Sequence, residues 1–531
     1  MDMSKPDRSM TRAHLIGGGI ASLAAAAILI RDGDLPGQNI TIYEELRRLG
    51  GSLDGSGDAE HGYVVRGGRM IESKYLCTYD LFDSIPTLDK KQTVTQEIFE
   101  WNRVMQTRSK SRLVRGRHKI DAPEFGLAER HILALEKLAM EPEALLGATS
   151  ISDHFGDDFF QTNFWLMWCT TFAFQPWHSA AEFRRYLLRF THMVQGFNEL
   201  QGIMRTVYNQ YDSLVLPLRR WLEERGVVFR MDCQVTDLGL SDDQDETVVY
   251  AIRCLRDGVA DEIAVGPDDL VIATLGSMTE ASSMGTMGEA PKMLGRRDGG
   301  AWALWEKVAK WRPELGSPAA FAGHVDESRW VSFTATMKDP LLFRKIMEFT
   351  GNVPGEGGLV TFADSAWLMS VVLPHQPHFI GQPEDVQVLW GYGLAVDKPG
   401  DFVKKPMADC SGRELMTELL GQFGFVDQAE AILQNSICLP CMMPFITSQF
   451  LRRKHGDRPA IRPEGYRNLA IVGQFCEQPD DVVFTVEYSV RSAMTAVYTL
   501  LDLKKEPPAV YKGQYDPRHL FAAFRALHDM A

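Results

Sequence analysis

A run of three glycines near the start of the chain has the most direct chemical meaning. Gly17, Gly18 and Gly19 stand between a short apolar segment, residues 14–16, and an alanine-rich segment, residues 21–30. In a strand–turn–helix arrangement the first glycine permits a tight turn, and the last lets a pyrophosphate approach the amides that open the helix. We therefore expect Gly17 and Gly19 to hold the phosphates of a dinucleotide.

The residues that follow extend this pattern. Ala21 and Ser22 complete a G-x-G-x-x-S spacing, in which the small serine permits close packing of helix on strand. Glu44 ends the next strand-like segment, near the distance expected of a carboxylate that accepts the ribose hydroxyls. Gly51 and Ser52 come soon afterwards. The alternative is an ordinary βαβ unit with a glycine turn, and the combined spacing favours the dinucleotide site.

Later segments favour FAD over NAD as the dinucleotide. Residues 468–473 form a buried-strand pattern ending in Gly473, and a helix predicted from about Thr485 to Leu501 can point its N-terminus at a flavin. We expect Gly473 at the end of the strand, Thr485 at the start of the helix, and Glu477 between them to contribute to the cofactor site. Val235 and Thr274 lie in a strand-rich block between residues 226 and 276 and are expected to contribute as well.

These residues must be positioned by a large α/β fold. The chain has 531 residues, of which 45% are hydrophobic, enough for two or three domains. We predict a Rossmann-like FAD-binding domain assembled from residues 13–90, 205–300 and 455–500. An inserted α+β substrate domain is predicted from residues 91–204 and 301–454, and a small C-terminal helical segment from residues 501–531.

Composition excludes several other classes of protein. Acidic residues outnumber basic ones by 70 to 56, and this net charge of −14 argues against a nucleic-acid partner. Eight scattered cysteines fit a reducing, cytoplasmic compartment rather than a disulfide framework. Cys438 and Cys441 form a single C-x-x-C pair, which we interpret as buried thiols, so no metal site is predicted. The longest apolar run, residues 20–30, is too short to cross a bilayer.

Longer motifs resemble those of the oleate hydratase family, formerly called myosin-cross-reactive antigens. The motifs lie at residues 66–69, 172–179, 208–213 and 473–491, and the resemblance runs from about residue 13 to the C-terminus. It implies an FAD-dependent hydro-lyase that adds water across the cis-9 double bond of oleic acid. The product would be 10-hydroxystearic acid, formed without net redox change, and the flavin would act structurally or electrostatically.

The resemblance also implies roles for particular side chains. Tyr186 matches the family's proton donor, and Gly68 and Arg69 belong to a loop that approaches the flavin or the substrate. Met70 stands where the family has a water-activating glutamate. Because methionine cannot accept a proton, either Glu72 or the flavin and backbone carbonyls orient the water, or turnover is slower.

A second departure concerns the carboxylate of the fatty acid. The family holds it with threonine, asparagine and histidine, and this chain has Val372, Pro374 and His378 at the matching positions. His375 is a candidate substitute for a lost donor. Gln210 carries over from the Y-N-Q-Y motif as a tunnel or carboxylate contact, beside Asn209.

Other interpretations stay open at this point. The split plan is shared by flavin oxidoreductases of the amine oxidase and desaturase type, and Met70 is also compatible with an FAD- and lipid-binding protein that has lost catalysis. The aromatic residues between 159 and 177 suit a hydrocarbon tunnel or a core. The C-terminal helix is expected to cover the tunnel mouth, to touch a bilayer, or to pack on the protein itself. We favour a monomer over a homodimer.

Overall fold

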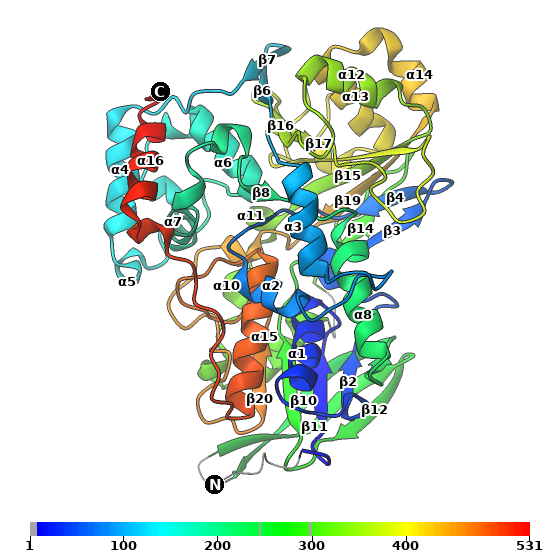
Figure 1. Cartoon of the computed structure of the whole chain (residues 1–531), viewed down its shortest axis with the longest axis vertical. Coiled ribbons are helices and arrows are strands. Elements are labelled where there is room, and N and C mark those ends of the chain that lie inside the picture. Colours follow the sequence, from blue (N-terminus) through cyan, green and yellow to red (C-terminus); the bar gives the residue numbers. More distant parts are fainter. Residues whose placement is uncertain (1–7, 244–245, 297–299, 531) are drawn as a thin grey trace.

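The glycine-rich turn follows the central strand of a parallel sheet, at the carboxyl end of that strand. The computed structural model describes residues 8–243, 246–296 and 300–530 (Figure 1). Five parallel strands form this sheet in the order β20-β13-β1-β2-β9. Their bounds are Ala13–Ile16 for β1, Ile40–Tyr43 for β2, Val228–Arg230 for β9, Leu270–Thr274 for β13 and Leu469–Val472 for β20. The strands come from three distant stretches of sequence, which confirms the α/β class.

Two long helices pack beside this sheet. Helix α1 (Ile20–Arg31) lies against α15 (Val486–Leu500), and both stand next to the sheet in Figure 1. Residues 20–29 of α1 are all buried, because the helix is covered on one side by strands and on the other by α15. Its alanines permit this close approach. A shorter helix, α8 (Leu216–Glu223), also contacts α1.

An antiparallel three-stranded sheet extends this region. It contains β10 (Cys233–Asp243), β11 (Glu246–Arg256) and β12 (Val259–Ala264). Asp257 and Gly258 join the last two strands with positive φ angles of 48° and 79°. This is the tight hairpin that an Asp-Gly pair favours.

A second large sheet occupies the other end of the molecule. Its eight strands run in the order β14-β19-β15-β18-β17-β16-β6-β7. Their bounds are Ser111–Arg115 for β6, His118–Asp121 for β7, Ser283–Met284 for β14, Trp330–Met337 for β15, Leu359–Phe362 for β16, Met369–Val372 for β17, Gln387–Gly393 for β18 and Ser436–Met443 for β19. Helices α12 (Leu341–Thr350), α13 (Gly412–Phe423) and α14 (Ala429–Gln434) lie at this end (Figure 1).

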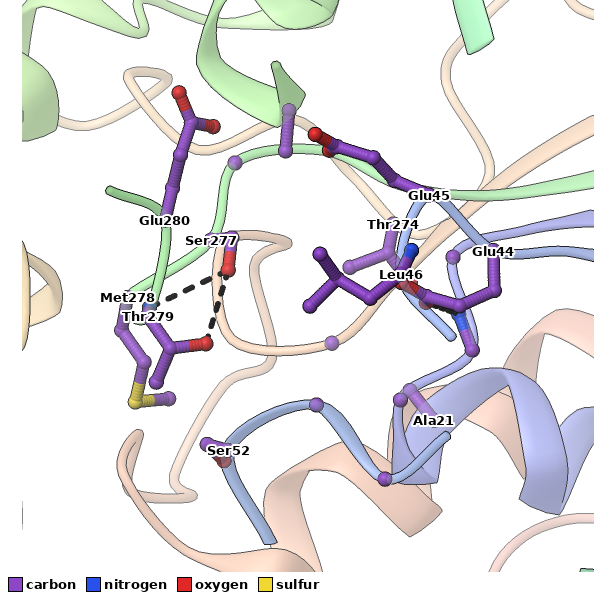
Figure 2. A pocket seen from close by; sticks show the side chains of 18 of the residues that line it. Ala21, Glu44, Glu45, Leu46, Ser52, Thr274, Ser277, Met278, Thr279 and Glu280 are labelled. Atoms are coloured by element: carbon purple, nitrogen blue, oxygen red, sulfur yellow. Dashed lines mark hydrogen bonds between the residues drawn. The ribbon is translucent and has the colours of Figure 1, made fainter. Parts of the chain in front are cut away.

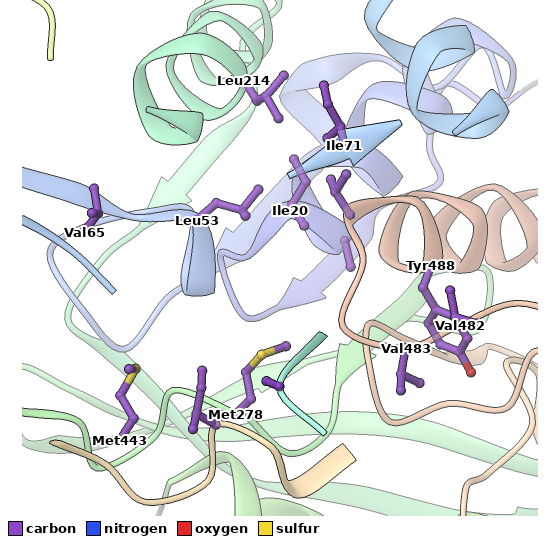
Figure 3. Close-up of a cluster of buried hydrophobic side chains, with 14 of the residues drawn as sticks. Ile20, Leu53, Val65, Ile71, Leu214, Met278, Met443, Val482, Val483 and Tyr488 are labelled. Atoms are coloured by element: carbon purple, nitrogen blue, oxygen red, sulfur yellow. The ribbon is translucent and has the colours of Figure 1, made fainter. Parts of the chain in front are cut away.

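A small ribbon from the N-terminal region joins the two sheets. It contains β3 (Gly55–Asp58) and β4 (Gly62–Val65). The Tyr63 and Val65 amides donate to the hydroxyls of Thr336 and Thr334 on β15, at 2.8 and 3.1 Å. Figure 3 shows apolar side chains from both regions gathered at this junction, among them Ile20, Leu53 and Met443. The exact domain boundaries stay a prediction.

A group of helices completes the fold. It contains α4 (Glu129–Met140), α5 (Glu143–Leu146), α6 (Asn163–Phe172), α7 (Ala180–Arg189) and the C-terminal α16 (Pro517–Leu527). The carboxylate of Asp529 accepts hydrogen bonds from the Phe125 and Gly126 amides, so the end of α16 is docked on the protein itself. Within the described ranges, no helix combines the length and apolarity needed to span a membrane.

Candidate active site

The turn after β1 has the geometry of a phosphate-binding loop. Gly17 adopts a φ of +90°, and a Cβ there would lie 3.3 Å from the Thr274 Cβ. The Gly18 amide donates to Glu44 Oε2 at 2.6 Å, and Glu44 Oε1 accepts from the Leu46 amide at 2.8 Å. Burial raises the pKa of Glu44. The carboxylate is thus held beside the glycines at the end of β2, where a ribose would lie.

These residues surround a cavity of about 330 Å³. Figure 2 shows side chains from separate segments facing this space. The structure brings together nine of the residues predicted to bind the cofactor: Gly17, Gly19, Ala21, Glu44, Gly51, Ser52, Val235, Thr274 and Gly473. The Gly-rich walls and the helix N-terminus at Ile20 fit the pyrophosphate of a dinucleotide.

Five of the predicted cofactor ligands lie outside this cavity. Gly68, Arg69 and Thr485 line the neighbouring second cavity, whereas Ser22 and Glu477 line neither. Ser22 is fully buried, and its hydroxyl lies 3.4 Å from the Thr274 hydroxyl, so it serves helix packing. Glu477 forms ion pairs with Arg185 at 2.8 Å and with Arg453 at 3.3 Å. Because these cations occupy its carboxylate, its placement argues against direct contact with the cofactor.

A second cavity, of about 100 Å³, adjoins the first and contains the predicted catalytic residues. It is lined by Tyr186, Met70 and Glu72, and also by Gly68, Arg69, Gln210 and Thr485. Thr485 caps α15 through its hydroxyl, which accepts from the Tyr488 amide at 3.2 Å. The N-terminus of α15 therefore faces this cavity, as the sequence predicts.

Tyr186 is held rigidly in this cavity. It lies on α7, whose N-cap Ser179 accepts a hydrogen bond from the Glu182 amide. The Tyr186 hydroxyl donates to the Val483 carbonyl at 2.6 Å, and its ring packs edge-on against Phe172 and Phe174. Burial raises its pKa well above the ordinary value of 10, so the phenol carries its proton at neutral pH.

Met70 and Glu72 line the same cavity as Tyr186. The thioether of Met70 offers no proton acceptor of useful basicity. Glu72 Oε1 lies 3.0 Å from Arg189 Nη1, and Glu72 Oε2 accepts from the Lys74 amide at 2.6 Å. Among the residues described around this cavity, Glu72 supplies the sole carboxylate.

A third, smaller cavity of about 50 Å³ holds the predicted carboxylate-binding residues. It is lined by Asn209, Gln210, His375 and His378, between Trp101 and Trp390. Burial lowers the pKa of both histidines, so they are neutral at pH 7. The side-chain amide nitrogen of Asn209 donates hydrogen bonds to Asp212 Oδ2 and to the His378 carbonyl, at 2.8 and 3.0 Å. The Gln210 amide nitrogen and His375 Nδ1 are buried without a partner in the described chain.

The three cavities form one series. Ser52 lines all of them, while Gly68, Arg69 and Gln210 line both the second and the third. Arg69 Nη2 donates to the Ser52 carbonyl at 3.2 Å, and its guanidinium lies over the Phe484 ring. Burial lowers the pKa of Arg69 to about 10. A dinucleotide and an apolar substrate can thus meet beside Ser52.

Sequence reasoning missed Arg205, which lines the third cavity together with Trp101, His375 and His378. Its position three residues before the Y-N-Q-Y motif was the available signal. Cys438 and Cys441 are buried free thiols, as predicted. In the part of the chain that the structure describes, no group of three or more His, Cys, Asp or Glu side chains could hold a metal.

Comparisons with known proteins agree with this architecture. The MCRA family model matches residues 10–498. The oleate hydratase of Streptococcus pyogenes serotype M49 (strain NZ131) is 39% identical, over 97% of this chain and 90% of its own. The linoleate hydratase of Lactiplantibacillus plantarum is 34% identical, over 98% of this chain and 99% of its own.

Solved structures show the same fold at much lower identity. An oxidoreductase from Methanosarcina mazei has a TM-score of 0.52 at 13% identity, covering 91% of this chain and 99% of its own. Cyclohexylamine oxidase from Brevibacterium oxydans IH-35A has a TM-score of 0.52 at 12% identity, covering 94% and 99%. The resemblance carried by the sequence motifs is confirmed by the family match, and the chain belongs to the MCRA family.

Proposed function

We propose that this chain hydrates the cis double bond of oleic acid and related unsaturated fatty acids to 10-hydroxy fatty acids. The observation that carries the proposal is the series of cavities, in which Ser52 lines a dinucleotide site, the Tyr186 cavity and a polar end pocket. The names of the two hydratase relatives support the substrate class.

FAD is the proposed cofactor. Gly17, Gly19 and Gly51 would hold its pyrophosphate, and Glu44 its ribose, while Arg69 and Thr485 face the flavin end. When bound, the flavin would supply a polar wall that shields the hydration site from bulk solvent, without net redox change. The buried, unpaired Nε of Arg69 fits such a polar group.

Tyr186 is the proposed acid. Its phenol transfers a proton to C9 of the alkene, so positive charge develops at C10, where a water molecule adds. A phenol is a weak acid for this step, so the cation must be stabilised by the surrounding dipoles and rings. Glu72 is the proposed water-orienting carboxylate, since Met70 cannot accept the proton that the water loses. Return of that proton to the tyrosinate closes the cycle.

Isotope labelling tests the function. Purified, FAD-loaded protein is incubated with oleate in water enriched in heavy oxygen, and products are analysed by mass spectrometry. Label in a 10-hydroxy product, formed equally without molecular oxygen, is the expected result. A product that requires oxygen or stoichiometric flavin reduction would instead indicate an oxidoreductase. Binding of FAD and fatty acid with no product from any unsaturated acid would indicate a protein that has lost catalysis.

We also propose a peripheral contact with the inner face of a membrane through α16. Leu520, Phe521 and Phe524 are 48%, 64% and 46% exposed, although α16 is docked through Ala523 and Asp529. Arg518 and Arg525 flank this apolar face. Such a contact would bring the protein to the bilayer where its substrate is dissolved. A cytoplasmic monomer is the expected form, to be checked by sedimentation at several concentrations.

A further inference from the structure

The third cavity contains a half-buried positive charge that has no partner among the described residues. In the described chain, the Arg205 guanidinium forms no hydrogen bond or ion pair, and its Nε and Nη2 atoms are buried. The carboxylate of Asp54, which also lines this cavity, is taken up by Arg66 at 2.7 Å. A guanidinium withdrawn from water without an anion is costly, so folded proteins rarely keep one without a use.

The backbone around Arg205 is fixed although its head group is free. The Arg205 amide donates to Asn102 Oδ1 at 3.0 Å, and Asn102 Nδ2 donates to the Arg205 carbonyl at 2.7 Å. Asn102 lies on α3 (Val94–Val104), beside Trp101, whose ring meets His375 edge-on at 4.7 Å. The guanidinium is therefore presented at a set place in the wall of the cavity.

The groups around Arg205 do not balance its charge, so the missing partner is an anion. Burial lowers the pKa of Arg205 to about 10, and the nearby cation contributes to the lowered pKa of His378. The histidines thus offer neutral ring nitrogens rather than charge. The walls at Val372, Pro374 and Trp390 are apolar and suit a hydrocarbon chain.

We propose that Arg205 is the anchor of the substrate carboxylate in this chain. It replaces the polar pair whose positions are occupied by Val372 and Pro374, and the buried amide of Gln210 and ring of His375 supply secondary hydrogen bonds. A carboxylate can bind the planar guanidinium through two parallel bonds, which also fixes its orientation. The proposal rests on the proposed function only for the identity of the acyl chain.

Binding of a saturated probe tests this without any need for hydration. Decanoate and decan-1-ol are titrated into the FAD-loaded protein and into the variants Arg205→Met, Arg205→Lys and Arg103→Met. The last removes an exposed arginine of α3 and serves as the matched control. We expect Arg205→Met to weaken decanoate at least about tenfold and decan-1-ol less than roughly threefold, with partial recovery in Arg205→Lys.

Thermal unfolding separates anchoring from a structural role. Removal of an unpaired buried charge should leave the Tm of the ligand-free Arg205→Met variant unchanged or higher, whereas loss of a structural arginine would lower it. A lower Tm, unchanged decanoate binding, or an equal loss for both probes would overturn the proposal. If hydration occurs, the oleate KM should rise while kcat changes less. If hydration fails but decanoate binding depends on Arg205, only the proposed function falls.

Discussion

Tyr186 is the residue on which the chemistry depends most. The Tyr186 hydroxyl donates a hydrogen bond to the Val483 carbonyl. Replacing the residue by phenylalanine therefore removes the proton donor without opening a cavity. We expect Tyr186→Phe to lower kcat for oleate about a hundredfold or more, with KM little changed. Tyr498→Phe, which removes a phenol bound to Asp32 outside the three cavities, is the control. Full turnover by Tyr186→Phe would refute the assignment.

The raised pKa of Tyr186 also predicts the pH profile. A phenol whose pKa lies well above 10 stays protonated throughout the neutral and mildly alkaline range. We therefore expect ionisation of Tyr186 to cause no decline of kcat for oleate between about pH 7 and pH 9. Any decline in that interval should persist in Tyr186→Phe. An alkaline limb centred in that interval and absent from Tyr186→Phe, measured by stopped assays on the FAD-loaded protein, would contradict the buried-phenol geometry.

Met70 stands where the family has a glutamate, and the effect of this difference is the easiest to measure. It lines the Tyr186 cavity, so Met70→Glu would place a carboxylate there in addition to Glu72. General-base assistance is commonly worth about a hundred- to ten-thousandfold. Because Glu72 is proposed to supply part of it already, we expect this variant to hydrate oleate about tenfold faster. Met70→Leu preserves the volume without a base and should leave the rate unchanged. If both variants behave alike, water is oriented elsewhere.

At the scale of elements, the turn between β1 and α1 has a strict backbone requirement. Gly17 adopts a φ of +90°, where a side chain costs roughly 1–3 kcal/mol, and its Cβ would contact Thr274. We expect Gly17→Ala to weaken FAD retention at least about tenfold, followed by flavin absorbance after gel filtration. Gly258→Ala introduces similar strain, at φ +79°, in an open hairpin. Equal flavin loss in both variants would indicate general destabilisation.

The sequence predicts elements where local patterns suffice. Helix α15, the Asp-Gly hairpin and the glycine turn follow from spacing over a few residues. The eight-stranded sheet does not, because β6 pairs with β16 across more than two hundred residues. Glu477 and Arg205 show the same limit for the site. Whether a charged side chain finds a partner depends on segments that only the folded chain brings together.

At the scale of the whole molecule, α16 is the proposed point of contact with a bilayer. Phe521→Ser and Phe524→Ser together remove exposed aromatic surface without touching the buried Ala523. We expect this double variant to lose most co-sedimentation with anionic vesicles while retaining hydration of dispersed oleate. Trp311→Ser removes an 89% exposed aromatic side chain elsewhere and is the control. Vesicle binding that survives the double change would place the contact on another surface.

The parallel sheet has a consequence for the order of events during synthesis. Strand β20 begins at Leu469, nearly two hundred residues after β13 ends at Thr274, so translation at about 5–20 residues per second leaves β13 without this neighbour for roughly 10–40 seconds. Throughout that interval the alanine-rich side of α1, which α15 later covers, is open to water and to chaperones. The proposed flavin site is therefore incomplete until β20 and Gly473 have been made, and nascent chains stalled before Leu469 should be recovered colourless.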